Sequence, residues 1–437
     1  MNRNRNLKSS FSLLRMLGLA LAFVPFLDLH AEEPNDDLQW FKGNLHTHTL
    51  WSDGNDFPEM AAKWYVDHGY NFLALTDHNI LSEGEKWVKY SLVESRGGKD
   101  VLKKYLEAYG DDWVVTRGES GTDSHEIRLK TLEQFRPTVE KTGQFLMIQA
   151  EEISDRSQGK PIHMNATNLA TVISPVGGET PRQAMENNLR AVQQQARRIG
   201  KPIMLHLNHP NFGYAVTAED IAAVVQERFF EVYNGHPGVN QLGDDTHVSI
   251  ERMWDIANTL RLSQLNGEVL YGVATDDTHN YHGRGGSRMG RGWVMVRASD
   301  LSPESLINAM NRGDFYSSSG VTLESTSFNK KKGVLSVKVK PEESVNYRIE
   351  FIGTRVKYDR TVKPRKDKDG NNLAVTRQYS ADVGATLKTV EGPSASYKLA
   401  GDEIYVRAVV HSDKPHVDAS FAGQVQQAWT QPVVITK

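Results

Sequence analysis

Short apolar runs recur along the chain between about Trp40 and Ser319, and most of them end in histidine or an acidic residue. Amphipathic stretches at 57–70, 181–200 and 218–228 lie between some of these runs and predict helices. Buried strands that alternate with helices are typical of a parallel sheet covered by helices, either a barrel or an open α/β sheet. The expected strands are 71–79, 145–154, 162–169, 202–210, 229–235 and 269–279. In such folds the loops after the strands meet in one place, so their polar residues should form one site.

The pattern changes after residue 320. Alternate residues are apolar in four later runs, and turn-rich charged segments such as 363–372 separate them. A period of two predicts strands with one buried face. These runs are 334–341, 347–354, 403–412 and 429–436. We therefore expect a C-terminal all-β, sandwich-like domain over 321–437, preceded by an α/β domain over 38–320 with an insertion at about 85–130.

Residues 1–31 have the features of a secretory signal peptide. Basic residues precede an apolar run at 16–27, and Ala31 offers a small residue at a cleavage point. The run is shorter than the roughly 20 residues that a membrane span needs, so we expect no span after cleavage. Leu29 fits the cleavage site poorly, which leaves an uncleaved anchor as the alternative. These features predict a periplasmic or secreted bacterial protein.

Composition excludes some kinds of site and partner. The 437 residues include no cysteine, which rules out a thiolate nucleophile and a Cys-ligated zinc site. The formal charge of −3 favours no polyanionic partner, so we expect no nucleic-acid surface. A small-molecule substrate is the partner that we expect.

The ends of the expected strands carry residues that bind divalent metals. Imidazole suits zinc or iron, and carboxylates suit manganese and can bridge two cations. Side chains two residues apart on an extended strand share a face, so His46 and His48 can bind one ion. A single histidine at a strand end is more often an ordinary polar residue, but repetition at successive strand ends favours a metal cluster. The candidates are His46, His48, Asp53, His78, Glu152 (with Glu151 as its rival), His163, His209, Asp277 and His279.

The order of these motifs resembles the polymerase and histidinol phosphatase (PHP) superfamily of metal-dependent hydrolases. The motifs that carry the resemblance are 46–54 (HTHTLWSDG), 76–79 (TDHN), 209–210 (HP) and 276–279 (DDTH). The segments 288–298 and 315–320 make the chain most similar to the secreted, carbaryl-hydrolase-like (CehA/McbA) branch. The resemblance extends from about Gly43 to the end of the chain.

This resemblance implies a distorted seven-stranded (β/α) barrel that holds two or three divalent ions of manganese, iron or zinc. His46, His48, Glu152 and Asp277 would then hold one ion. Glu152 would bridge to a second ion held by His163 and His209, and Asp53, His78 and His279 would hold the third. The long insertion departs from the usual pattern, and since it should border the mouth of the barrel it bears on substrate specificity.

A polynuclear site of this kind favours hydrolysis, because bound ions lower the pKa of a shared water from its bulk value towards about 7. We expect an exported phosphoesterase that attacks a small phosphorylated substrate with a metal-activated water. Arg284, Arg288 and Arg291 could bind the phosphate, although a solvated arginine loop is the alternative. His236 could donate a proton, although a turn histidine is the alternative, and Asp77 could orient a ligand imidazole.

Two other functions fit the same residues. An amidase, carbamate hydrolase or esterase needs no different metal arrangement, because a carbonyl oxygen can be polarised in the same way. A metal-stabilised binding protein belongs to another class and would need an exposed row of aromatic side chains on the C-terminal strands. The candidates for such a row are Tyr347, Tyr358, Tyr397, Tyr405 and Trp429.

Overall fold

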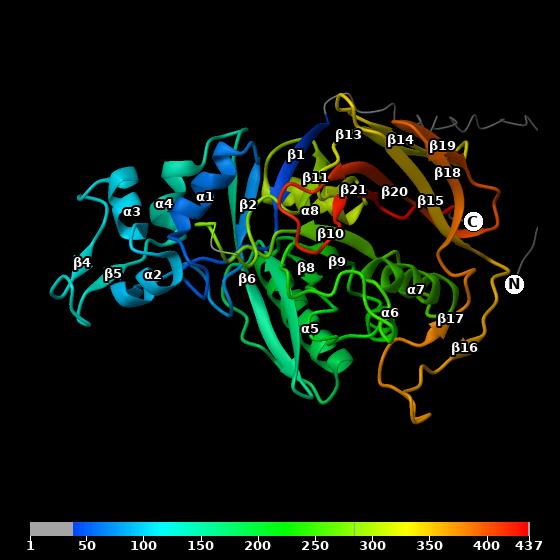
Figure 1. The fold of residues 1–437 in the computed structure, drawn as a ribbon, viewed down its shortest axis with the longest axis horizontal. Coiled ribbons are helices and arrows are strands. Elements are labelled where there is room, and N and C mark those ends of the chain that lie inside the picture. Colours follow the sequence, from blue (N-terminus) through cyan, green and yellow to red (C-terminus); the bar gives the residue numbers. More distant parts are fainter. Residues whose placement is uncertain (1–37, 284, 436–437) are drawn as a thin grey trace, which may run out of the picture. The chain divides into compact units, whose positions relative to one another are not determined.

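One mixed sheet of 13 strands runs through the protein, as seen in a computed structural model that describes residues 38–283 and 285–435 (Figure 1). The predicted signal peptide at 1–31 and the candidate Arg284 lie outside the described residues. The strands follow the order β10-β9-β8-β7-β6-β2-β1-β11-β12-β21-β20-β15-β18. The α/β class predicted from the sequence is confirmed.

Seven neighbouring strands of this sheet surround the candidate metal ligands. They are β1 (Gln39–Asn44), β2 (Phe72–Leu75), β6 (Leu146–Ser157), β7 (Lys160–Thr167), β8 (Met204–Leu207), β9 (Phe229–Asn234) and β10 (Tyr271–Thr275). The pairs β1/β2, β2/β6, β8/β9 and β9/β10 are parallel. A parallel bridge between Thr47 and Thr278 joins the residues after β10 to those after β1. The seven strands therefore curve back on themselves, and their ends meet around one centre.

Strand β7 departs from the expected parallel arrangement, because it is antiparallel to both β6 and β8. Only Gln158 and Gly159 separate β6 from β7, and both have positive φ angles of 53° and 76°. A two-residue turn of this kind makes a hairpin, whereas a parallel crossover needs a dozen or more residues. The expectation of a purely parallel arrangement is therefore wrong at β7.

Helices cover the strands, largely where the sequence predicts them. Helix α1 (Pro58–Asp67) begins at a proline, and α5 (Pro181–Ile199) ends at Gly200 in the left-handed conformation. Apolar residues of α5, α6 (Ala218–Ala223) and α7 (Ile250–Ser263) share one core with β6 to β9. The other helices of this part are α4 (Leu132–Val139) and α8 (Pro303–Asn311). None of the described helices combines the length and apolar character that a membrane crossing requires.

Helix α6 ends five residues before the predicted end at residue 228. Val224 and Val225 follow its last residue, and β-branched side chains lower the helix propensity. The guanidinium group of Arg261 in α7 donates to the carbonyl oxygens of Val224, Val225 and Glu227. These carbonyls are therefore satisfied without a longer helix, and the chain turns directly into β9.

Beyond β1 the sheet continues with antiparallel strands. These are β11 (Trp293–Ala298), β12 (Phe315–Ser318), β21 (Val425–Thr430), β20 (Glu403–Pro415), β15 (Tyr347–Arg355) and β18 (Ala385–Glu391). A smaller sheet of β13 (Leu323–Asn329), β14 (Val334–Val339) and β19 (Ser394–Lys398) shares a core with β15 and β20. Strands β16 (Val362–Lys363) and β17 (Gln378–Tyr379) form a separate pair.

The sheet is continuous across residue 320, because β21 lies between β12 and β20. A buried ion pair also links the two stretches: Nε and Nη2 of Arg407 in β20 each donate to Asp255 in α7 at 2.8 Å. The described residues belong to one compact unit. Two domains over 38–320 and 321–437 therefore remain a prediction.

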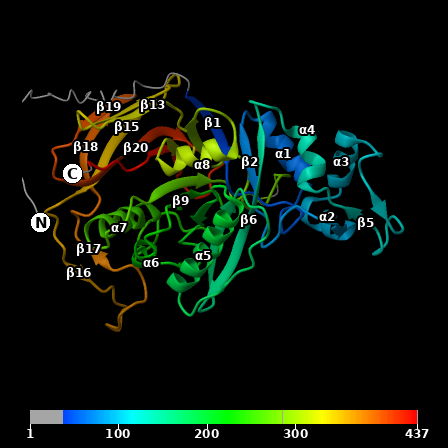
Figure 2. The ribbon, with the colours of Figure 1, turned by 180° about the vertical axis from the view of Figure 1, so that it is seen from behind.

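The insertion forms its own small layer at the end of the unit opposite the C-terminal strands (Figure 2). It contains the sheet β3 (Trp87–Lys89), β5 (Glu126–Arg128), β4 (Thr116–Arg117) and the helices α2 (Tyr90–Gly97) and α3 (Val101–Tyr109). The buried Glu59 in α1 anchors it, accepting hydrogen bonds from the Tyr105 hydroxyl and, at 2.7 Å, from Trp113 Nε1. The insertion is thus packed on the α/β part rather than tethered to it.

Candidate metal centre

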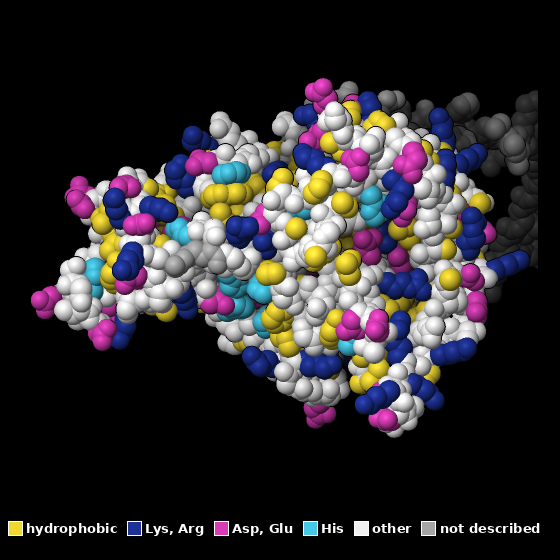
Figure 3. Space-filling model, in the orientation of Figure 1, with side chains coloured by type: hydrophobic (Ala, Val, Ile, Leu, Met, Phe, Trp, Pro, Cys, Tyr) yellow, Lys and Arg dark blue, Asp and Glu magenta, His cyan; other side chains and the backbone are white. Residues whose placement is uncertain are grey.

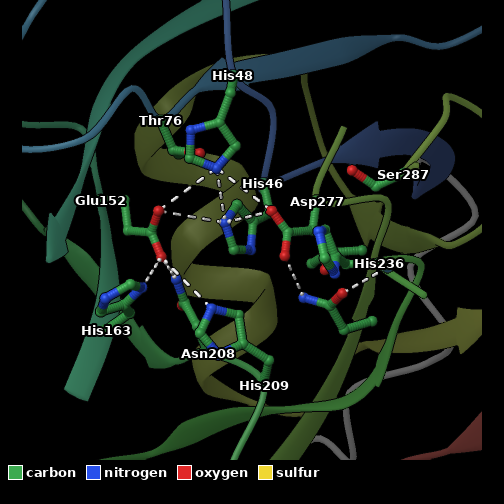
Figure 4. Close-up of polar contacts among 12 residues, drawn as sticks. His46, His48, Thr76, Glu152, His163, Asn208, His209, His236, Asp277 and Ser287 are labelled. Carbon is green, nitrogen blue, oxygen red and sulfur yellow. Dashed lines mark hydrogen bonds and ion pairs between the residues drawn. The ribbon is translucent and has the colours of Figure 1, made fainter. Parts of the chain in front are cut away.

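The structure brings all nine predicted ligands together around the ends of the strands, and Figure 4 shows six of them: His46, His48, Glu152, His163, His209 and Asp277. His46 and His48 follow β1, His78 follows β2, His209 follows β8, and Asp277 and His279 follow β10, while Glu152 and His163 lie within β6 and β7. Histidine side chains gather on the face shown in Figure 3, beside the insertion. Strand topology, rather than closeness in sequence, assembles the cluster.

The most buried group consists of His46, His48, Glu152 and Asp277. Nε2 of His46 lies 3.1 Å from Nε2 of His48, 3.6 Å from Oε2 of Glu152 and 3.2 Å from Oδ1 of Asp277. Nε2 of His48 lies 3.4 Å and 3.3 Å from the same two carboxylate oxygens. A tetrahedral ion with ligand bonds of roughly 2.0–2.1 Å would separate its ligand atoms by about 3.3 Å. The spacing of these four side chains therefore fits a single divalent ion.

Glu152 also faces a second group. Its Oε1 lies 2.9 Å from Nδ1 of His163 and 3.6 Å from Nε2 of His209, and it accepts a 2.8 Å hydrogen bond from Asn208. Among the described residues, Oε2 of Glu152 and Nδ1 of His163 are buried and make no well-aligned hydrogen bond. Buried polar atoms normally have such a partner, so a cation between these groups would account for both.

The third group is the most exposed. Oδ1 of Asp53 lies 3.5 Å from Nε2 of His78, 3.3 Å from Nε2 of His279 and 3.7 Å from Nδ1 of His48. The Asp53 side chain is 48% exposed, whereas those of His46 and His48 are fully buried. Access from solvent to the cluster is therefore on the Asp53 side.

Two of the ligands have the protonation state that cation binding needs. Burial raises the pKa of Glu152, but the charges of His163, His46 and His78 outweigh it and hold the pKa well below the usual value. Burial and the nearby His279 lower the pKa of His48 to about 3, so its ring is neutral at pH 7. An ionised carboxylate beside a neutral imidazole is the donor set that divalent metals require. The carboxylates outweigh burial at two others, raising the pKa of His46 well above its usual value and that of His78 to about 11, so a cation would displace protons from these rings.

The sequence reasoning missed Glu231, a fully buried residue of β9. Four donors contact its carboxylate at 2.7 Å each: Nδ1 of His46, the backbone N–H of His209, the hydroxyl of Thr275 and the amide of Asn234. The Asn234 amide also donates to Oδ2 of Asp277 at 3.1 Å. Glu231 therefore supports three of the nine ligands. The sequence feature that could have indicated this role is a single acidic residue inside the apolar run 229–235.

The contact of Glu231 with His46 also decides the tautomer of that ring. An ionised carboxylate only accepts hydrogen bonds, so Nδ1 of His46 carries the proton. Once a cation has displaced the second proton of the ring, the lone pair of Nε2 would point towards His48 and Asp277. A carboxylate that orients a ligand imidazole in this way is common at metal sites.

Other candidates near the ligands have different roles. Asp77 accepts hydrogen bonds from the backbone and hydroxyl of Thr49 at 2.8 Å and from Ser52 at 2.6 Å, so it braces the loop after β1. Asp77 reaches a ligand imidazole only through Ser52, whose Oγ lies 3.4 Å from Nδ1 of His48, so its role in orienting that ring stays a prediction. Glu151 accepts a 2.6 Å hydrogen bond from the backbone of Ile173, and burial raises its pKa to about 7. Glu152, not Glu151, faces the cluster.

The Arg291 side chain is buried and held by other residues. Its Nε and Nη2 donate to Asp418 at 3.1 Å, and Nη1 donates to the carbonyls of Gly235 at 2.7 Å and Gly286 at 3.0 Å. Arg288 pairs with the same Asp418. Most N–H donors of Arg291 are therefore already used in hydrogen bonds within the protein. This geometry does not favour the predicted role of Arg291 in binding phosphate.

His236 lies close to the third group, with its ring centroid 5.7 Å from that of His279. The backbone N–H of Gly238 donates to Nδ1 of His236 at 2.9 Å. Burial lowers the pKa of His236, so the neutral ring carries its proton on Nε2. His236 therefore lies in a turn, as the alternative prediction had it, and its Nε2–H is available as a hydrogen-bond donor beside the cluster (Figure 4).

Comparison with known proteins gave no match to a protein-family model or to a curated protein. Solved structures similar to this chain are described as PHP-like or metal-dependent phosphoesterases. One is a two-domain protein from Bacteroides vulgatus ATCC 8482 containing a predicted PHP-like metal-dependent phosphoesterase, at 14% identity and a TM-score of 0.36, covering 91% of this chain and 96% of that one. Another, from Bifidobacterium adolescentis ATCC 15703, is described as a proposed metal-dependent phosphoesterase, at 12% identity and a TM-score of 0.27, covering 56% and 92%.

Proposed function

We propose that this chain is an exported metal-dependent phosphoesterase of the PHP superfamily that hydrolyses a small phosphorylated molecule. The observation that carries the proposal is the position of Glu152, whose two oxygens face two different groups of histidines. A carboxylate between two cations is the arrangement that hydrolytic polynuclear sites use. The order of the sequence motifs supports the same family.

The residues would divide among two or three ions of manganese, iron or zinc. His46, His48, Glu152 and Asp277 would hold the buried ion, with Glu152, His163 and His209 holding a second and Asp53, His78 and His279 a third. When bound, such ions supply Lewis acidity that makes a water nucleophilic near neutral pH and neutralises charge on the group under attack. Strands β1, β2 and β6 to β10 are the strands that we assign to the distorted seven-stranded barrel.

The side chains around the ions would bind and orient the substrate. We assign His236 as a hydrogen-bond donor to the leaving-group oxygen, because Gly238 holds Nδ1 and the proton of the neutral ring is on Nε2. The ring of Phe212 lies 5.1 Å from His209 and 5.7 Å from His236, so it provides an apolar wall next to both. A substrate with a compact phosphate and a partly apolar leaving group would fit these neighbours.

A substrate screen tests the proposal. The purified protein, loaded with manganese, iron or zinc, is assayed on p-nitrophenyl phosphate, a phosphodiester, nucleotides, an aryl ester and an aryl carbamate. We expect turnover of a phosphate ester that a chelator abolishes and the same metal restores. Turnover of the ester or carbamate alone would overturn the phosphoesterase assignment.

Carbamate, amide or ester hydrolysis is a second candidate. Asp418 pairs with both Arg288 and Arg291, which reduces the positive charge available to a phosphate. A neutral carbonyl substrate needs no such cation. A binding protein is less well supported, because all five aromatic residues that could form an exposed row are buried: Tyr347, Tyr358, Tyr397, Tyr405 and Trp429.

A further inference from the structure

Arg96, at the end of α2, joins the insertion to the backbone on both sides of Asp53. Nη1 of Arg96 donates to the carbonyl oxygen of Ser52 at 2.7 Å and to that of Gly54 at 3.4 Å. These two carbonyls flank Asp53, the exposed carboxylate of the third group. Arg96 therefore holds the backbone on both sides of a candidate ligand without contacting the ligand itself.

A second set of contacts connects the same place to the loop after β10. Asn55 donates from Nδ2 to the carbonyl of Arg96 at 3.4 Å and to Oδ1 of Asn280 at 2.9 Å. Its Oδ1 accepts from the backbone of Tyr281 at 2.8 Å, and its own N–H donates to the carbonyl of His279 at 3.0 Å. The loops that carry Asp53 and His279 are thus joined to each other and to the end of α2.

The helix end packs tightly against these loops at Gly97. A Cβ atom at this position would lie 2.7 Å from the carbonyl oxygen of Asn55 and 3.1 Å from the ring of His282. Real Cβ atoms do not approach a backbone oxygen so closely, so a side chain here would push α2 away from the loop. The close approach shows that the insertion is in direct contact with the backbone of the site.

We propose that the insertion is a positioning element for the third cation site and that Arg96 is the residue through which it acts. Asp53 is half-exposed on a loop, so fixing its backbone lowers the entropy lost when a cation is bound. The buried group around His46 and Glu231 has support of its own from β9 and needs no such contact. Removal of Arg96 should therefore weaken one ion and spare the others.

This inference rests on the proposed metal site but not on the reaction, so metal titration alone tests it. Full-length protein is freed of metal and titrated with manganese or zinc, with calorimetry and elemental analysis as readouts. Arg96→Ala should bind one ion about tenfold or more weakly, which is the usual effect of losing a supporting contact. The remaining ions should keep the affinity of the unaltered protein, and the metal-free variant should unfold at nearly the same denaturant concentration.

Arg117→Ala is the matched control, because Arg117 belongs to the same insertion but pairs with Glu126 at its exposed end. It should bind metal like the unaltered protein. Arg96→Lys keeps a donor within reach of Ser52 and should recover part of the lost affinity, and it decides the question if Arg96→Ala does not fold. Unchanged binding in every Arg96 variant, or equal weakening of all ions, would overturn the proposal. Absence of phosphatase activity with the expected metal loss would contradict only the proposed function.

Discussion

Nδ1 of His46 donates a 2.7 Å hydrogen bond to Oε1 of Glu231, and the same carboxylate accepts the backbone N–H of His209 at 2.7 Å. One side chain of β9 thus fixes a ligand that follows β1 and the backbone of another that follows β8. The buried ions would therefore depend on a residue that contacts neither of them.

Glu231→Gln should weaken metal retention by roughly 10- to 100-fold while leaving the fold intact, because an amide cannot accept at both positions. Metal content after dialysis against a weak chelator measures the effect. Glu151→Gln is the matched control, since Glu151 is buried next to Glu152 but accepts only the backbone N–H of Ile173. Equal metal loss in both variants would contradict the role of Glu231.

Asp277→Ala should remove bound metal and hydrolytic activity together. Asp277 lies within 3.3 Å of both His46 and His48, so its loss takes one carboxylate from the most buried group. Elemental analysis and the substrate assay are measured on the same preparation. Full metal content in this variant would refute the ligand assignment.

Asp418→Asn should lower KM for a phosphate ester and leave a neutral ester unaffected, because it releases charge on Arg288 and Arg291. The pair of Asp418 with Arg288 is partly exposed and worth up to about 1 kcal/mol, so its loss should give a decrease of at most about fivefold. Asp413→Asn is the control, since this exposed residue of β20 contacts Asn346 instead. A rise in KM for both substrates would indicate that Asp418 acts only on the shape of the loop.

Arg407→Ala should lower the free energy of unfolding by about 3–5 kcal/mol, because it leaves Asp255 buried without its partner. Denaturant unfolding measures this loss. The double variant Asp255→Ala, Arg407→Ala should lose less free energy of unfolding than the two single variants lose together, since neither charge remains buried without a partner. The exposed pair of Lys338 with Glu324 provides the control, and Lys338→Ala should cost less than about 1 kcal/mol.

Glu227→Gln should flatten the pH dependence of stability between pH 4.5 and 8. Burial raises the pKa of Glu227 to about 8, so the folded protein keeps a proton that the unfolded chain releases above its ordinary pKa of 4.5. Stability should therefore fall as pH rises through this window, at up to about 1.4 kcal/mol per pH unit. Denaturant unfolding of the variant and of the unaltered protein at several pH values measures the slope. An equal slope in both would contradict this role of Glu227.

Much of the site could be predicted because strand ends in an α/β fold converge, which places His46, Glu152 and Asp277 together without knowledge of their contacts. Glu231 could not be found in this way, because its role depends on the register of β9 between β8 and β10. The pairing of Arg291 with Asp418 joins residues 127 positions apart, and no local pattern reports it.

In the fold too, features set by neighbouring residues could be predicted, whereas features set by distant contacts could not. Caps and turn residues predicted α1 and α5 closely, since they act over a few residues. The hairpin of β6 and β7 was missed, although Gln158 and Gly159 carry its turn, because the apolar pattern of a strand does not reveal its direction. The Asp255 and Arg407 pair depends on packing between α7 and β20 and has no signal in either segment alone.

The place of β21 between β12 and β20 has a consequence for how the protein is made. Strand β12 is complete at residue 318, yet its second neighbour begins only at residue 425. Until that segment leaves the ribosome, β12 presents an open edge and the central sheet is incomplete. The central sheet would therefore be completed only after residues 425–430 have been made, long after β11 and β12.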